Sequence, residues 1–169
     1  GHNLTYLGLP AEEAHDILSW IDYIDYVIAF QCRNYPEPSS VEQPRDVIIK
    51  LEKKLLELER QGKLNSFSLY DGYIEEVLIK DKDTTGQEYI QDRTVTVYNL
   101  DFCNSIIAPI YYSDENRVMQ KAFKSEAIRK LLELQRLNCS RTQNGKFIMF
   151  LTVHSKFFGN EEKRFLNQQ

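Results

Sequence analysis

Residues 94–104 read TVTVYNLDFCN, and this stretch decides the fold class of the chain. It begins as an alternating, β-branched strand and ends in an acid, an aromatic ring, a thiol and an amide. Ligands of parallel α/β sheets bind at the carboxyl ends of the strands. Polar residues that end a middle strand therefore mark the place where a ligand or substrate would lie.

Further strand-like runs surround this one, and helical patterns separate most of them. The other predicted strands cover residues 3–10, 26–30, 67–70 and 146–153. Residues 26–30 are apolar throughout, and residues 147–153 are apolar except for Thr152, which predicts strands that are covered on both faces. Apolar side chains at helical spacing predict helices over residues 11–23, 44–60 and 117–138, and residues 161–169 could open another.

Three segments between these elements are expected to be irregular or short. Residues 73–79 fit either a short helix or an edge strand, residues 80–92 a polar excursion or hairpin, and residues 109–116 a loop. Strands separated by helices favour right-handed crossovers and a parallel sheet. We therefore expect one Rossmann-like α/β domain over residues 1–169: a doubly wound, mostly parallel sheet of about five strands with helices on both faces. It is expected to be part of a longer protein or assembly.

Composition narrows the classes of function. The 169 residues carry a net charge of −4 with a pI near 5.5, which argues against a broad surface for nucleic acid. No apolar run approaches the ~20 residues of a membrane span, and the start does not resemble a signal peptide. Three widely spaced cysteines favour a reducing cytoplasm, and no Cys/His cluster indicates zinc. The basic set of Lys121, Lys124, Arg129, Lys130, Arg136 and Arg141 is expected to be a solvated helix face.

Polar or glycine-containing turns follow the first four predicted strands. Leu7, Gly8 and Pro10 form the turn that ends the first strand, where glycine lets a ligand approach the backbone; a simple turn without a ligand is the alternative. Gln31 follows the second strand and can bond a hydroxyl; a solvated strand end is the alternative. Asp71-Gly72 ends the third strand, either at a ligand or at a plain turn.

The end of the fourth strand holds the strongest site candidates. Asp101 is costly to bury without a partner, so it should face a cleft, a partner or a helix N-terminus. Phe102, Cys103 and Asn104 follow it. Cys103 would need a histidine to act as a nucleophile, and His154 would be near if the last two strands are neighbours; an inert buried thiol is the alternative reading.

This layout resembles a class I S-adenosylmethionine-dependent methyltransferase. In that family a glycine turn after the first strand holds the methionine part of the cofactor, and here that turn is Leu7-Gly8-Leu9-Pro10. The resemblance places Gln31 at the ribose, Asp71 and Gly72 at the adenine, and Asp101 and Asn104 at the substrate as catalytic residues. The chain departs from the family: it lacks the run of glycines and the ribose acid, and it has five strands where seven are usual.

Two classes of function follow. The first is a methyltransferase-like domain that binds S-adenosylmethionine, weakly active or inactive. The second is a non-catalytic α/β interaction module of a larger assembly. Exposed apolar surface beside the fifth strand is expected to mark a place for missing sequence, a second copy or a protein partner.

Overall fold

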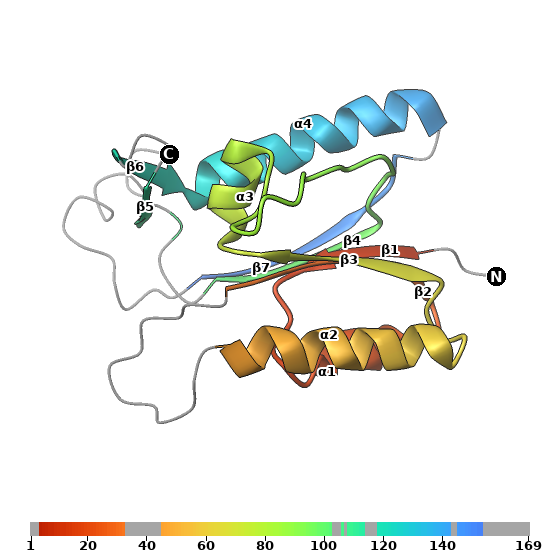
Figure 1. Ribbon diagram of the computed structural model, residues 1–169. Helices are drawn as coiled ribbons and strands as arrows, with labels where there is room; N and C mark the ends of the chain where they lie inside the picture. The colour runs from red at the N-terminus through yellow and green to blue at the C-terminus, as the bar shows by residue number, and fades with distance from the viewer. Residues whose placement is uncertain are drawn as a thin grey trace.

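A computed structural model of the chain describes residues 4–32, 45–102, 106, 108–113, 118–142 and 145–153. Five parallel strands form its central sheet in the order β3-β2-β1-β4-β7 (Figure 1). These strands are β1 (Leu4–Gly8), β2 (Ile24–Gln31), β3 (Ser66–Asp71), β4 (Val97–Phe102) and β7 (Ile148–Val153). The fold class expected from the sequence is confirmed.

Helices cover both faces of the sheet. Helices α1 (His15–Trp20) and α2 (Arg45–Arg60) lie on one face, and α3 (Ile74–Lys80) and α4 (Lys124–Thr142) lie on the other (Figure 1). The segment 73–79, which fitted either a helix or a strand, is therefore helical. The apolar stripe of α2 includes Leu51, Leu55 and Leu58, all buried against the sheet.

The period-2 alternation of the strands divides the core into two layers. Tyr6 of β1 points to the α1–α2 side and its neighbour Leu7 to the α3–α4 side. On β2, Val27 and Ala29 join the first layer, while Ile28 and Phe30 join the second. Because both faces are covered, residues 26–30 of β2 are apolar throughout, as the sequence pattern predicted.

An antiparallel hairpin lies between β4 and α4, where the sequence predicted a loop followed by a helix. It consists of β5 (Pro109–Ser113) and β6 (Met119–Phe123), and helix α4 begins only at Lys124. The loop expected at residues 109–113 and the helix expected at residues 119–123 are therefore wrong, whereas residues 114–117 lie outside the described residues. Residues 119–123 pair with β5 instead of forming the start of the helix, and helical spacing alone cannot reveal that partner.

The first helix is also shorter than predicted. Residues 11–14 form a turn, closed by the Ala14 amide donating to the carbonyl of Ala11 at 2.9 Å. Ala14 has a φ of 50°, which interrupts a helix that the apolar spacing would extend from residue 11. Glu12 therefore lies in a loop after β1 rather than in a helical turn.

Strand β7 is an exposed edge, contrary to the prediction of a fully buried strand. It pairs with β4, and no other described strand lies beyond it. Ile148 and Phe150 are 56% and 45% exposed, whereas Met149 and Val153 pack partly against the layer under α4. An apolar sequence thus predicted burial correctly for β2 but not for β7, because its position at the edge depends on strand order.

Candidate functional site

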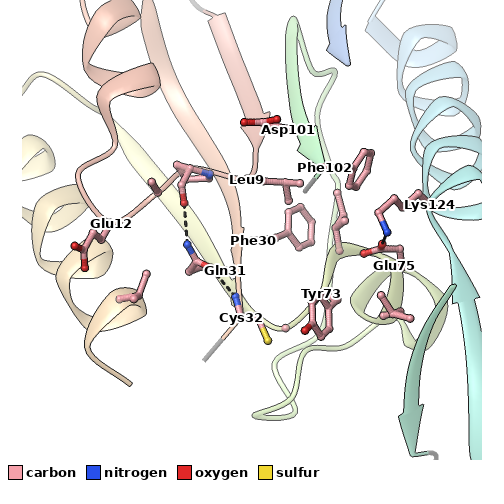
Figure 2. Close-up of a pocket in the computed structure, with 16 residues that line it drawn as sticks. Leu9, Glu12, Phe30, Gln31, Cys32, Tyr73, Glu75, Asp101, Phe102 and Lys124 are labelled. Carbon is pink, nitrogen blue, oxygen red and sulfur yellow. Dashed lines mark hydrogen bonds and ion pairs between the residues drawn. The ribbon is translucent and has the colours of Figure 1, made fainter. Parts of the chain in front are cut away.

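A pocket of about 460 Å³ opens at the carboxyl edge of the sheet (Figure 2). The segments that follow β1, β2 and β3, together with the end of β4, form its wall. The sheet order places β1 between β2 and β4, so the chain reverses direction across the sheet at this point. Ligands of doubly wound folds bind at such a switch point, and the volume is typical of small-molecule sites.

Five of the site candidates singled out from the sequence line this pocket: Pro10, Gln31, Gly72, Asp101 and Phe102. They come from four different strand ends, and the parallel sheet brings them together. Three others, Leu7, Gly8 and Asp71, are not among the lining residues. Asn104, Cys103 and His154 lie outside the described residues.

The side chain of Gln31 ties two loops of the pocket together. Its Nε2 donates to the carbonyl of Pro10 at 3.0 Å, and its Oε1 accepts from the amide of Cys32 at 2.9 Å (Figure 2). The same turn is held from the third strand, because the amide of Gly72 donates to the carbonyl of Gln31 at 3.0 Å. Gln31 therefore fixes the shape of the pocket floor.

Gly8 is required by packing inside the domain. A Cβ on Gly8 would lie 2.3 Å from the Tyr6 hydroxyl oxygen and 2.8 Å from the carbonyl oxygen of Asn99. Asp16 of α1 accepts from the Tyr6 hydroxyl and, at 3.0 Å, from the side-chain amide of Asn99. Burial, followed by the charge of Asp16, raises the pKa of Tyr6 well above its usual range. This network lies beneath the pocket loops and aligns β1, α1 and β4.

Asp71 ends β3, is buried, and bonds the loop that follows α3 through its backbone. The Asp71 amide donates to Asp83 Oδ2 at 3.0 Å, and the Asp71 carbonyl accepts from the Thr84 amide at 2.8 Å. Asp83 also accepts from the amides of Thr85 and Gln87, which holds the polar excursion of residues 80–92 in a compact turn. Gly72 has a φ of 144°, a conformation that glycine adopts without strain, and this turns the chain into the pocket wall.

A buried ion pair forms one wall of the pocket. Lys124 Nζ lies 3.1 Å from Glu75 Oε1, and the two side chains are only 5% and 3% exposed (Figure 2). Lys124 starts α4 and Glu75 lies in the first turn of α3, so the pair joins these helices. The prediction that Lys124 belongs to a solvated helix face is wrong. The sequence shows two charged residues 49 positions apart, and no local pattern connects them.

Aromatic side chains complete the wall. Phe30, Tyr73 and Phe102 line the pocket, and Lys124 Nζ lies 5.6 Å from the centre of the Phe102 ring. Burial raises the pKa of Tyr73 to about 12, with further contributions from its contact with Cys32 and from Glu75 and Glu76. The Tyr73 phenol therefore carries its proton at neutral pH.

Two of the acids that line the pocket have ion-pair partners among the described residues, and a third does not. Glu12 pairs with Lys50 at 3.1 Å and Glu75 pairs with Lys124. Asp101 is exposed, and within the described part of the chain its carboxylate forms no hydrogen bond or ion pair. Sequence reasoning found Asp101 but missed Glu12, Glu75 and Tyr73. A signal for Glu12 existed, since it follows the same turn as Gly8 and Pro10.

Comparison of the chain with protein-family models, with curated proteins and with solved structures gave no significant match. Among the described residues, no helix is both long enough and apolar enough to cross a membrane. No group of three or more potential metal-binding acids, histidines or cysteines occurs in that same part of the chain. The case for a function therefore depends on the pocket itself.

Proposed function

We propose that this domain is methyltransferase-like and binds S-adenosylmethionine in the pocket at the carboxyl edge of the sheet. The observation that carries the proposal is Asp101, an uncompensated acid that lines the same pocket as several aromatic rings, at the switch point of the sheet. A ligand with a cationic centre and an apolar body suits such a site, because carboxylates and aromatic faces both attract cations. S-adenosylmethionine combines a sulfonium cation with an adenine ring.

The same charges disfavour a dinucleotide. Pyrophosphate is usually bound by a glycine-rich turn whose amides point at the anion. The turn after β1 has one glycine, Gly8, whose space is filled by Tyr6 and Asn99. An anion would also meet the carboxylate of Asp101. The site therefore supports an onium ligand over a phosphate-rich one.

Each part of the wall has a role in this proposal. When bound, S-adenosylmethionine supplies an electrophilic methyl group. Asp101 holds the cationic centre and is placed to accept a proton from a methyl acceptor at the mouth of the pocket. Gln31 and Gly72 keep the loops in place, and Glu12 offers carboxylate oxygens to hydroxyl groups. Neither Cys32 nor Cys139 forms a disulfide, which agrees with a reducing compartment, and we place the protein in the cytoplasm.

Calorimetric titration with S-adenosylmethionine and S-adenosylhomocysteine tests the charge argument. The two ligands differ in the sulfonium charge, so Asp101→Asn should weaken binding of the first more than that of the second. The matched control is Asp92→Asn, which removes an exposed acid outside the pocket lining. Equal losses for both ligands would contradict the role given to Asp101, and absence of binding would contradict the proposed function.

Alkylation of Cys32 locates the bound ligand. Cys32 lines the pocket and Cys139 does not, and neither cysteine forms a disulfide. Bound S-adenosylmethionine should slow the reaction of Cys32 with iodoacetamide and leave Cys139 unaffected, as measured by peptide mass spectrometry. Equal rates with and without ligand would place binding elsewhere.

Turnover is a separate question from binding. We expect the 169-residue chain to bind the cofactor and to transfer methyl groups poorly or not at all. Incubation with labelled S-adenosylmethionine and pools of small molecules, DNA, RNA and protein measures this directly. Rapid labelling of any pool would show that the isolated chain is a competent enzyme.

The exposed edge of the sheet favours a second function, self-association. Phe147, Ile148, Phe150 and Leu151 are all about two-fifths exposed or more, and Trp20 of α1 lies beside Phe150 with ring centroids 6.2 Å apart. No charged residue occurs from 147 to 153, although charged side chains commonly protect sheet edges. An uncharged strand can pair with its own copy without repulsion. Light scattering should find a dimer that Ile148→Lys dissociates, and a monomeric wild type would refute self-association.

A further inference from the structure

The Lys124–Glu75 pair has hydrogen-bonding capacity that the described residues do not use. The Lys124 ammonium has three N–H donors, of which one meets Glu75 Oε1 at 3.1 Å and another the carbonyl of Ala108 at 3.4 Å. Glu75 Oε2 accepts no hydrogen bond within the described part of the chain. Both residues line the pocket. One donor and one acceptor are thus left next to each other in the pocket wall.

The burial of the pair limits what it can bind. With the two side chains 5% and 3% exposed, only an edge of the pair is accessible. The pair is neutral as a whole, so it attracts neither anions nor cations by net charge. Bringing a further charged group against it would add another desolvation cost. A neutral group that presents an acceptor beside a donor fits this edge.

The surroundings add a preference for a flat ring. Phe102 lies next to the Lys124 ammonium, and Tyr73 and Phe30 line the same pocket (Figure 2). Aromatic rings stack on planar heterocycles, while a hydrogen-bonding edge fixes their orientation. An aminated heterocycle with a ring nitrogen beside the amino group satisfies both requirements.

We propose that Lys124 and Glu75 form a base-reading edge: Lys124 donates to a ring nitrogen and Glu75 accepts from the adjacent amino group. Adenine has this arrangement, whereas hypoxanthine has the reverse one, with a ring N–H and a carbonyl oxygen. The inference rests on the proposed function and deepens it, because it names the residues that select the base. It predicts discrimination between adenosine and inosine by the same pocket.

The ligand series that tests this needs no substitution in the protein. Adenosine should bind roughly tenfold or more tightly than inosine, because inosine leaves both buried groups facing the wrong partner. Purine riboside, which lacks the amino group, and 1-deazaadenosine, which lacks the ring nitrogen, should each lose part of this affinity. Equal binding of adenosine and inosine would overturn the inference and leave the proposed function standing. Absence of binding by all four nucleosides and by S-adenosylmethionine would instead show that the proposed function has failed.

The double variant K124M/E75L tests whether the Lys124–Glu75 pair causes the discrimination between adenosine and inosine. It keeps side-chain volume and removes both charges, so nucleosides should still bind while the adenosine-to-inosine ratio falls to about one. The matched control is K130M/D81N, which removes the ion pair between Lys130 and Asp81 that also links α4 to the end of α3 but lies outside the pocket lining. That control should keep the wild-type ratio. A ratio that persists in K124M/E75L would refute the role of the pair.

Discussion

One residue of α4, Gln135, holds the segment that leads into β4. Gln135 is 2% exposed, and its side-chain amide accepts from the Val95 amide and donates to the Val95 carbonyl, both at 2.8 Å. Tyr98 donates to the same Oε1 at 3.1 Å. The Gln135 side chain thus makes the two hydrogen bonds that a neighbouring strand would make with the Val95 backbone. The buried N–H and C=O of Val95 are both satisfied in this way.

Gln135→Ala should therefore destabilise the domain strongly. It would leave the Val95 amide and carbonyl buried without partners, at a cost of about 2 to 4 kcal/mol in the free energy of unfolding. Urea denaturation measures this loss. Gln61→Ala is the control, since the exposed Gln61 side chain donates to Glu57 at 2.9 Å on the helix surface, and its effect should stay within about 0.5 kcal/mol. Similar losses for both variants would deny Gln135 its structural role.

At the scale of elements, the Lys124–Glu75 ion pair joins α3 to α4. Burying the pair costs desolvation free energy, but removing only one partner costs more, because the other charge is then buried alone. Lys124→Met alone would leave the Glu75 carboxylate buried without its cation, which is expected to cost about 3 to 5 kcal/mol. The double variant K124M/E75L should recover most of that loss, because apolar side chains of similar volume often replace a buried pair at little cost. A double-mutant cycle by thermal or urea unfolding measures the coupling. If the double variant is as unstable as the single one, packing rather than charge accounts for the loss.

At the scale of the whole molecule, buried tyrosines make stability depend on alkaline pH. Burial raises the pKa of Tyr73 to about 12. Burial also raises the pKa values of four other tyrosines above the ordinary value: Tyr6, Tyr70, Tyr89 and Tyr98. A tyrosine with a raised pKa keeps its proton in the fold after the unfolded chain has lost it. This contribution to stability is fully present below the unfolded pKa of 10.0 and is lost as pH rises through the folded values.

Urea midpoints should therefore be level up to about pH 9 and fall steeply above pH 10. Tyr73→Phe should make the fall between pH 10 and 12 shallower without changing the midpoint at pH 8 by much, since Tyr73 is only partly buried. Absorbance of tyrosinate at 295 nm, followed together with unfolding, would link the two events. Ionisation at pH 10 without loss of structure would contradict this account.

The sequence by itself determined the five parallel strands and the two-sided sheet. Val27 to Phe30 form an unbroken apolar run, and α2 carries its apolar side chains at helical spacing. These are local periodicities that depend only on neighbours in the chain. They also bring Pro10, Gln31, Gly72 and Asp101 to one edge, because parallel strands end on the same side.

Tertiary structure alone decided which polar groups meet. Lys124 pairs with Glu75, and Gln135 bonds Val95, although the partners are far apart in the chain. The identity of a lysine or a glutamine does not indicate which distant residue it contacts. The same is true of the hairpin β5–β6, where strand pairing prevailed over the helical spacing of residues 119–123. Strand β7 is apolar like β2 yet lies at the edge, because exposure depends on the order of the strands in the sheet rather than on the composition of any one of them.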